Sequence, residues 1–265
     1  MKSDPHVLKE IPEPSYFELQ ASLGVTAHMG GLQATKELVA FCHVDKDVSV
    51  LDVGCGIGAA TCYIAKTYGC SIVGVDISEE MVARSKKRAQ KEGVRDKTEF
   101  RVGDAQILPF EDATFDVVVS ESVIAFVQDK KRAITEYARV VKPQGYVGLN
   151  ETTWITPPSQ ELVTYLASIT GVDPESPEGW EELLKNSGLD TVVVKLCKTT
   201  YVSQFINEAR MMGLTEVVRP WGRLLSLYFK DPVYRKAIKE MTKEARNVPK
   251  NVFDYFGYGL YVSRK

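Results

Sequence analysis

The chain has 265 residues, 44% of them hydrophobic and 26% charged, which is the composition of a globular protein and excludes wholesale disorder. Its 33 Lys and Arg residues and 35 Asp and Glu residues give a formal net charge of -2, which argues against a protein that binds DNA or RNA through their phosphates. No apolar run approaches the ~20 residues of a membrane span, and the first residues lack the apolar stretch of a secretory signal, so we expect a cytoplasmic protein.

The five cysteines and three histidines form neither a disulfide framework nor a metal-binding pattern. The number of cysteines is odd, no two of them make a C-x-x-C pair, and the histidines are scattered. We therefore expect reduced thiols and no bound metal.

The chain opens with a segment of irregular pattern. Residues 1–30 contain several prolines and show no regular apolar period, which predicts an arm or lid over the core. A helix is expected from Gly31 to Cys42, because the apolar residues of that stretch fall on one face.

Strand and helix patterns alternate from about residue 48 to residue 150. Strands are expected at residues 48–53, 72–76, 99–102, 115–119 and 146–149. Helices are expected at 59–66, after a Ser78 cap, and at 131–141, where Pro143 and Gly145 end the helical pattern. This alternation predicts an α/β fold with a mostly parallel sheet and helices on both of its faces.

The alternation is lost after residue 151. Helices are expected at 160–170, 180–185, 203–213 and 231–246, a strand at 191–196 and a β-like end at 253–262. We therefore divide the chain into an N-terminal arm (1–30), a ligand-binding core (31–152) and a third part (153–265). That third part holds the remaining strands of the core and helical insertions that cap the substrate.

A glycine loop follows the first strand of this core. Asp52 ends the strand, and Gly54, Gly56 and Gly58 follow at every second position before a helix begins. Glycines let the backbone turn tightly and approach a ligand, and the N–H groups of the helix N-terminus face it. Asp76 ends the next strand, where a carboxylate can accept hydrogen bonds from both hydroxyls of a ribose. The pattern predicts a nucleoside pocket.

The register of this loop distinguishes two cofactors. The run Gly54-x-Gly56-x-x-Ala59 can be fitted to a dinucleotide fingerprint, but Asp52-x-Gly54-x-Gly56-x-Gly58 fits better. In that register the chain resembles the class I S-adenosylmethionine (SAM)-dependent methyltransferases, and within them the small-molecule branch that includes ubiquinone/menaquinone and sarcosine-type methyltransferases. The resemblance runs from about His28 to Glu151.

Further segments carry the same resemblance. They are Gly74–Ser78, Gly103–Ala105, and Phe115–Ser120 followed by Lys142–Gly145, where Gln144 stands in place of the usual glycine. The resemblance implies a Rossmann-like fold, SAM as methyl donor, S-adenosylhomocysteine (SAH) as product and no metal. It also implies that the cofactor is bound by Asp52, Gly54, Cys55, Gly56, Gly58, Asp76, Ile77, Asp104, Ala105 and Ser120.

Within that set, the resemblance implies different roles for different residues. The loop glycines and Asp52 lie near the methionine and ribose parts, and Asp76 binds the ribose hydroxyls. Ile77 covers the adenine face. Asp104 takes the exocyclic amine of adenine, and the Ala105 N–H meets a ring nitrogen.

Residues that act on the acceptor are harder to identify from the sequence. His28, in a His-x-Gly-Gly element, and Glu121, directly after the fourth strand, are candidate catalytic residues. His28 could equally cap a helix or lie at the surface. Tyr16, Trp154 and Phe205 are candidates for the substrate pocket, with core packing as the alternative for such aromatic residues.

The expected activity is transfer of a methyl group from SAM to a small-molecule acceptor by in-line displacement. An Asn-Pro-Pro-Tyr run is absent after the fourth strand, which argues against methyltransferases of DNA amines and protein glutamine. An NAD-dependent oxidoreductase that uses the same loop and a non-catalytic SAM-binding module are the two alternatives. The sequence specifies neither the acceptor atom nor the oligomeric state.

Overall fold

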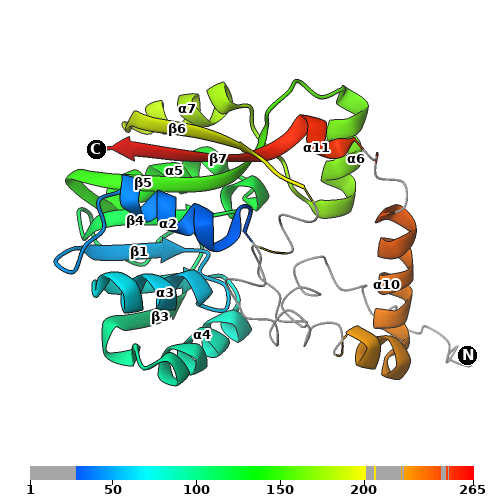
Figure 1. Ribbon diagram of the computed structural model, residues 1–265, viewed down its shortest axis with the longest axis horizontal. Helices are drawn as coiled ribbons and strands as arrows, with labels where there is room; N and C mark the ends of the chain where they lie inside the picture. Colours follow the sequence, from blue (N-terminus) through cyan, green and yellow to red (C-terminus); the bar gives the residue numbers. More distant parts are fainter. Residues whose placement is uncertain (1–27, 201–205, 207–221, 223, 246–248, 250) are drawn as a thin grey trace, which may run out of the picture.

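The computed structural model describes residues 28–200, 206, 222, 224–245, 249 and 251–265, and the structural statements below refer to these residues. They form a seven-stranded sheet with the order β3-β2-β1-β4-β5-β7-β6 (Figure 1). Its strands are β1 (Ser49–Val53), β2 (Ser71–Asp76), β3 (Thr98–Val102), β4 (Phe115–Glu121), β5 (Val141–Trp154), β6 (Asp190–Lys198) and β7 (Phe256–Arg264).

The strand order reverses at the middle of the sheet. β1 pairs in parallel with both β2 and β4, and β4 continues in parallel with β5. β7 lies antiparallel between β5 and β6. The predicted mostly parallel α/β sheet is confirmed. At such a reversal a crevice opens beyond the carboxyl ends of the strands, which places a ligand site beside β1 and β4.

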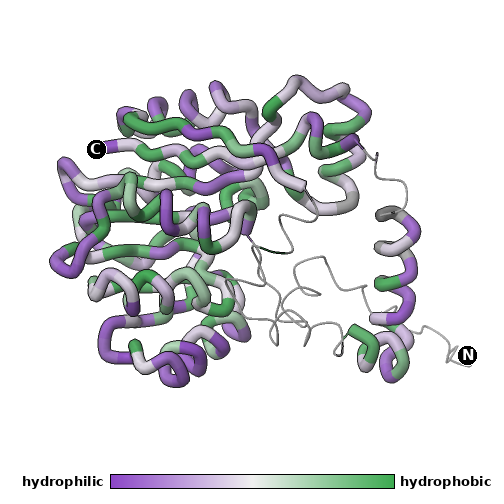
Figure 2. Tube along the Cα trace, in the orientation of Figure 1, coloured by the Kyte–Doolittle hydropathy of each residue, from purple (hydrophilic) through white to green (hydrophobic). Residues whose placement is uncertain are grey.

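Helices cover both faces of the sheet, and each has one apolar side. One face carries α2 (Gly31–Phe41), α3 (Ala59–Tyr68) and α4 (Glu79–Glu92). The other carries α5 (Lys130–Val140) and α7 (Pro177–Lys185). In Figure 2 the colour of these helices changes between purple and green along the chain, as expected when only one side packs on the strands.

Of the remaining helices, α6 (Gln160–Thr170), α10 (Pro232–Ala245) and α11 (Val252–Tyr255) lie toward one end of the molecule. The short 3₁₀ helix η1 (Arg95–Lys97) precedes β3 at the amino ends of the parallel strands, and the 3₁₀ helix η2 (Ile124–Phe126) follows β4. In Figure 1, α10 stands away from the sheet, and it contacts α6. The predicted helix at 231–246 is therefore present as α10, whereas the one predicted at 203–213 lies outside the described residues.

The fifth strand is longer than the sequence predicts. It spans fourteen residues, because Pro143 and Gly145 lie within the strand rather than before it. The pairing with β4 shifts register between Phe115 and Val117, so an irregularity accommodates them. Gln144 adopts a positive φ of 68°, the left-handed conformation that favours the glycine usual at this place.

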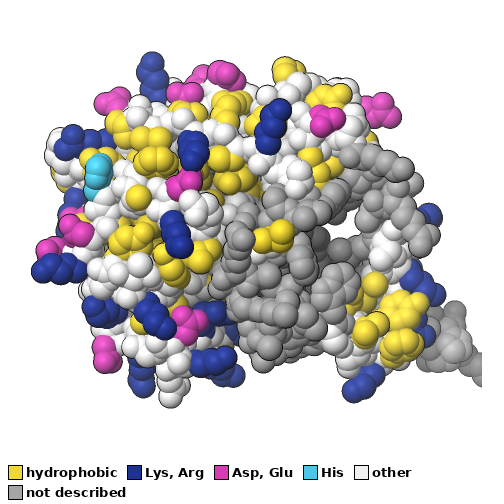
Figure 3. Space-filling model, viewed as in Figure 1, with side chains coloured by type: hydrophobic (Ala, Val, Ile, Leu, Met, Phe, Trp, Pro, Cys, Tyr) yellow, Lys and Arg dark blue, Asp and Glu magenta, His cyan; other side chains and the backbone are white. Residues whose placement is uncertain are grey.

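The described residues show no disulfide bond and no membrane-spanning helix, and the surface carries charges of both signs. All five cysteines are free, and four of them are buried. On the face seen in Figure 3, basic and acidic side chains are interspersed over the sheet-bearing part. Among the described helices, none has the length and apolarity needed to cross a bilayer.

Candidate active site

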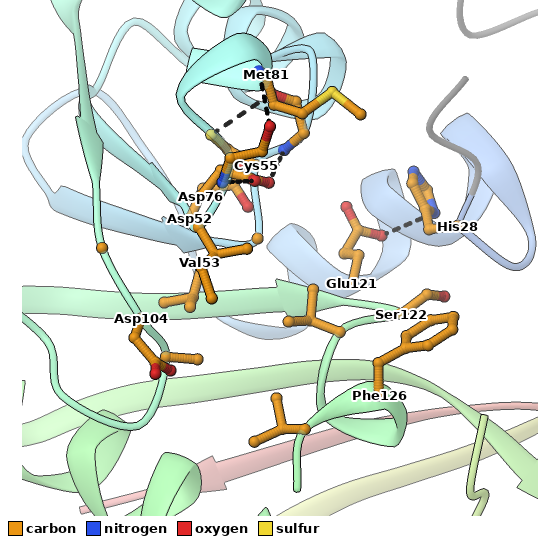
Figure 4. A pocket seen from close by; sticks show the side chains of 18 of the residues that line it. His28, Asp52, Val53, Cys55, Asp76, Met81, Asp104, Glu121, Ser122 and Phe126 are labelled. Atoms are coloured by element: carbon orange, nitrogen blue, oxygen red, sulfur yellow. Dashed lines mark hydrogen bonds and ion pairs between the residues drawn. The ribbon is translucent and has the colours of Figure 1, made fainter. Parts of the chain in front are cut away.

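A cavity of about 450 Å³ opens at the carboxyl ends of β1, β2 and β4, where the strand order reverses (Figure 4). Its volume lies in the range of small-molecule and cofactor sites. The described residues that line it are His28, Asp52, Val53, Gly54, Cys55, Gly56, Ala59, Ala60, Asp76, Ile77, Ser78, Met81, Gly103, Asp104, Ala105, Gln106, Glu121, Ser122, Val123, Phe126, Val127 and Gln128.

The glycine loop is held against β2 and packed closely on its neighbours. The N–H groups of Gly54 and Cys55 both donate to the Val75 carbonyl, at 2.7 and 2.9 Å. Gly54 has a φ of +77°, and a Cβ there would lie 2.2 Å from Cγ2 of Val123. A side chain at this position would therefore collide with the opposite wall of the cavity.

Asp76 is well placed to bind a ribose. Its Oδ2 accepts the Gly56 N–H and its Oδ1 accepts the Ser78 N–H, both at 2.9 Å. Burial raises the pKa of this carboxyl, and the two N–H donors oppose that rise. Each oxygen keeps a further acceptor position, so the carboxylate can take two hydroxyls without losing its orientation.

Replacing Asp76 by alanine is expected to weaken SAH binding by roughly 1–3 kcal/mol, the scale of hydrogen bonds to a charged group. Isothermal calorimetry measures this directly. Asp96→Ala, which removes an exposed aspartate of η1, serves as the control and should leave the dissociation constant unchanged. Equal affinities of the wild type and Asp76→Ala would refute the ribose assignment.

Asp52 lies beneath the loop, at the end of β1. Its side chain is buried and its Oδ2 accepts the Thr61 hydroxyl of α3 at 2.5 Å. Burial, with smaller contributions from the nearby charges of Glu121 and Asp76, raises its pKa to about 7. The Thr61 bond opposes this rise and ties the first turn of α3 to the strand end.

The far end of the cavity is formed by the residues expected to bind adenine. Asp104 accepts hydrogen bonds from the Gln106 backbone N–H at 2.8 Å and from its side-chain amide. Ala105 and Ile77 lie beside it in the lining, and Ile77 is 73% exposed, so it offers an uncovered apolar surface. In Figure 4, Asp104 lies on the opposite side of the cavity from His28.

The two candidate catalytic residues meet at that other side. His28 Nδ1 lies 3.3 Å from Glu121 Oε2, and both side chains are buried (Figure 4). The Thr35 hydroxyl donates to Glu121 Oε1 at 2.9 Å, and the Asn150 amide donates to Oε2 at 3.0 Å. His28 thus belongs to a buried polar cluster at the cavity wall.

Some of the predicted site residues lie elsewhere. Gly58 caps α3 and Ser120 accepts the Tyr137 hydroxyl, and neither belongs to the described lining. Trp154 packs in an apolar cluster with α6 and with Phe256, which is the core role given above as its alternative. Tyr16 and Phe205 lie outside the described residues, as do residues 1–27 of the predicted arm.

The segment after β4 was not identified from the sequence, although it forms one wall. It contributes Ser122, Val123, Phe126, Val127 and Gln128. Glu151 on β5 supports this wall from beneath, because its carboxylate accepts the N–H groups of residues 123, 124 and 125 at 2.9, 2.8 and 3.3 Å. Burial raises the pKa of Glu151 to about 7 against these three donors.

From the raised pKa values of two buried carboxyls, we expect their contribution to the free energy of unfolding to decrease between pH 5 and pH 8. The pKa values of Asp52 and Glu151, both about 7, exceed the ordinary values of an unfolded chain. Their stabilising contribution is complete below about pH 4 and is lost as the pH rises through 7.

Asp52→Asn should therefore gain about 2 kcal/mol of unfolding free energy relative to the wild type between pH 5 and pH 8. Urea unfolding at several pH values checks this. A difference between the two proteins that does not change with pH would contradict the raised pKa of Asp52.

The residues of this cavity fit SAM chemically. SAM presents an adenine, a ribose diol, a cationic sulfonium and an amino acid end with an ammonium and a carboxylate, but no phosphate. The described lining offers acids, backbone groups and apolar side chains, and neither lysine nor arginine belongs to it. A site for a dinucleotide would have to accommodate a pyrophosphate, for which these residues provide no cationic side chain.

Comparison with known proteins agrees with this chemistry. A methyltransferase domain model matches residues 51–149. An uncharacterised protein of Haemophilus influenzae is 31% identical over 206 residues, which cover 75% of this chain and 82% of that protein. Phosphoethanolamine N-methyltransferase 1 of Zea mays is 34% identical over 167 residues, covering 63% of this chain, and norajmaline N-methyltransferase of Rauvolfia serpentina is 38% identical over 130 residues, covering 45%.

The chain spans about 33% of the length of the maize protein and 44% of the length of the Rauvolfia protein.

Two solved structures share its fold at 20% identity. They are the [4+2]-cyclase SpnF (TM-score 0.74, covering 94% of this chain and 92% of that one) and Haemonchus contortus phosphoethanolamine N-methyltransferase 2 in complex with SAM (TM-score 0.70, covering 94% and 57%).

The domain match coincides with the strands that build the cavity, and the Haemophilus relative extends the similarity over most of the chain. The glycine loop, Asp76 and Asp104 lie together at the carboxyl edge of the sheet, as the SAM motifs require. The chain therefore belongs to the class I S-adenosylmethionine-dependent methyltransferases.

Proposed function

We propose that this protein transfers the methyl group of SAM to the nitrogen of a small-molecule amine, bound at the side of the cavity where Glu121 and Phe126 lie. The observation that carries this proposal is the charge of the lining. Four carboxyl groups line the cavity, those of Asp52, Asp76, Asp104 and Glu121, and the described lining contains no lysine or arginine. Such a site favours cationic ligands and disfavours phosphates.

The relatives support a nitrogen acceptor. The maize and Rauvolfia proteins are named as N-methyltransferases, of phosphoethanolamine and of norajmaline. The described lining offers no cationic side chain to a phosphate group, so we propose an amine without one. Fold alone does not decide this, because a protein with the same fold is named as a cyclase.

Bound SAM would supply a methyl carbon attached to a cationic sulfur, which is already an activated leaving group. The chain's own residues have the task of alignment. The acceptor nitrogen must be neutral when its lone pair forms the N–C bond and the C–S electron pair passes to sulfur. An amine that binds as an ammonium therefore releases one proton per turnover. Orientation in a water-poor cavity accounts for the larger part of such a rate gain.

We extend the proposal to the surroundings of the site. We propose that the residues between β6 and β7, which include α10, form a cap over the acceptor, and that residues 1–30 form a lid. The interspersed surface charges support a small molecule rather than a nucleic acid as the partner (Figure 3). The free, mostly buried thiols support a cytoplasmic location.

Transfer of a labelled methyl group from SAM to a panel of acceptors tests this function. The panel contains phenethylamine, tryptamine, ethanolamine, phosphoethanolamine and phenylethanol. We expect label in the amines and little in phosphoethanolamine or phenylethanol. Label confined to the alcohol or to the phosphorylated amine would refute an unphosphorylated amine acceptor, and SAM binding without transfer to any compound would favour the non-catalytic module.

A further inference from the structure

A buried polar cluster forms the side of the cavity opposite Asp104. It consists of His28 just before α2, Thr35 on α2, Glu121 at the end of β4 and Asn150 on β5. Thr35 and Asn150 have no solvent exposure, and the side chains of His28 and Glu121 are 8% and 5% exposed. The sequence placed Asn150 at the end of the fifth strand, where it could point into the cleft, but offered no reason to connect Thr35 with the site.

Glu121 is the centre of this cluster. Its Oε1 accepts the Thr35 hydroxyl at 2.9 Å, its Oε2 accepts the Asn150 amide at 3.0 Å, and His28 Nδ1 lies 3.3 Å from Oε2. A carboxylate has about four acceptor positions, so these three neighbours leave capacity for one more donor. Because Glu121 itself lines the cavity, a ligand can supply that donor.

Thr35 and Asn150 hold Glu121 from outside the described lining, whereas His28 belongs to that lining. Both ring nitrogens of His28 are engaged, Nδ1 beside Glu121 and Nε2 at 3.2 Å from the Thr35 hydroxyl. Asn150 also donates to the Met29 carbonyl at 2.8 Å, which fixes the segment before α2. Because both ring nitrogens are engaged, this geometry favours a positioning role for His28 over the catalytic role expected from the sequence.

Asn150 has a buried side-chain oxygen that lowers the stability of the folded protein. Its amide nitrogen serves Glu121 and Met29, while its buried Oδ1 has no hydrogen-bond partner among the described residues. A buried carbonyl left without a donor is destabilising. What its amide does in the site is to hold the Glu121 carboxylate at Oε2.

The position of Glu121 separates it from the nucleoside side of the cavity. Asp104, at the predicted adenine end, lies on the opposite side in Figure 4, and Asp76 is held by the glycine loop. Phe126 and Ser122 lie on the same side as Glu121 and His28 in that view. A carboxylate and an aromatic ring at one end of a cavity are the groups that bind an ammonium, through a charged hydrogen bond and a cation–π contact.

Resting on the proposed amine acceptor, we propose that Glu121 binds the nitrogen of that acceptor and sets the preference for amines over alcohols. Thr35, Asn150 and His28 act through it as positioning residues that hold its carboxylate toward the cavity.

The decisive variant is Glu121→Gln, which keeps the size of the side chain and removes its charge. Binding of phenethylamine and of phenylethanol to the SAH-loaded full-length protein is measured by calorimetry, which does not depend on turnover. The wild type is expected to prefer the amine. In Glu121→Gln, amine affinity should fall at least about tenfold and the preference should disappear, with the SAH dissociation constant changed less than threefold.

Thr35→Val tests the positioning role, because it removes the hydroxyl donor and keeps the side-chain shape. It should raise the KM for phenethylamine several-fold, with a smaller change in kcat. Thr153→Val is the matched control, since it deletes a buried hydroxyl bonded to Tyr261 at 3.0 Å outside the described lining. The control should lower only the thermal stability.

Three results would overturn this assignment, and they are distinguishable from one another. Loss of SAH binding in Glu121→Gln would mean that Glu121 binds the cofactor. Unchanged amine preference in that variant would remove the anchor role and leave the proposed function standing. A wild type that binds no amine but methylates phenylethanol would overturn the amine function itself, and the anchor with it.

Discussion

Gly54→Ala is expected to weaken SAH binding more than about tenfold and to lower the free energy of unfolding by about 2–4 kcal/mol. Gly54 has a φ of +77°, and its added Cβ would lie 2.2 Å from Cγ2 and 3.0 Å from Cγ1 of Val123. The glycine loop and the wall after β4 cannot both keep their places. Because Gly54 and Val123 both line the cavity, any displacement changes its shape. Calorimetry with SAH and urea unfolding measure the two effects.

Two further variants separate the collision from backbone strain. Gly93 has a similar φ of +72°, but a Cβ there meets nothing within 4 Å, so Gly93→Ala shows the cost of the conformation alone. That variant should lose only about 1 kcal/mol and keep its SAH affinity. Adding Val123→Ala to Gly54→Ala should restore part of the binding. If Gly54→Ala and Gly93→Ala bind SAH equally well, the proposed collision does not govern the site.

Glu151→Ala is expected to cost about 3 kcal/mol or more of folding free energy, because it leaves buried N–H groups of residues 123–125 without their acceptor. In a chain of this size that corresponds to a fall of roughly 6–12 °C in Tm. The wall after β4 should also loosen, so SAH affinity is expected to decrease. Differential scanning fluorimetry with and without SAH measures both changes.

Glu151→Gln and Glu161→Ala are the comparisons for this variant. The glutamine retains an acceptor oxygen and resembles the protonated form of a group whose pKa is about 7, so it should lose less stability than alanine. Glu161 lies exposed in the first turn of α6, and its replacement should leave Tm within about 1 °C. A Glu151→Ala protein as stable as Glu161→Ala would show that the three N–H bonds contribute little.

Local patterns predicted the fold, and they placed the aspartates of the expected cofactor site at one edge of the sheet. Asp52 and Asp76 each end a β-branched run, and the spacing of the loop glycines is a property of one short segment. Parallel strands bring their carboxyl ends to one edge, so these residues could be placed together without coordinates. The structure brings both aspartates, with Asp104, into the lining of one cavity.

Long-range pairing explains what could not be predicted. Thr35 and Glu121 are separated by 86 residues, and no local pattern links them until α2 packs over β5 and β7. Glu151 is similar, since its partners are backbone N–H groups, which carry no signature of residue type. Pro143 and Gly145 follow the end of α5 at Val140, as predicted, but the start of β5 before them was not predicted, because the strand passes them through an irregularity in its pairing with β4.

The most direct test of the whole account is a calorimetric titration of the full-length protein with SAH, and separately with NAD. The titration tests whether the cavity beside β1 and β4 holds a nucleoside joined to an amino acid. The described lining of that cavity offers no lysine or arginine to a pyrophosphate. We predict one SAH bound per chain with a micromolar dissociation constant and no measurable heat from NAD. Tight binding of NAD together with no measurable heat from SAH would contradict the assignment of this cavity to SAM.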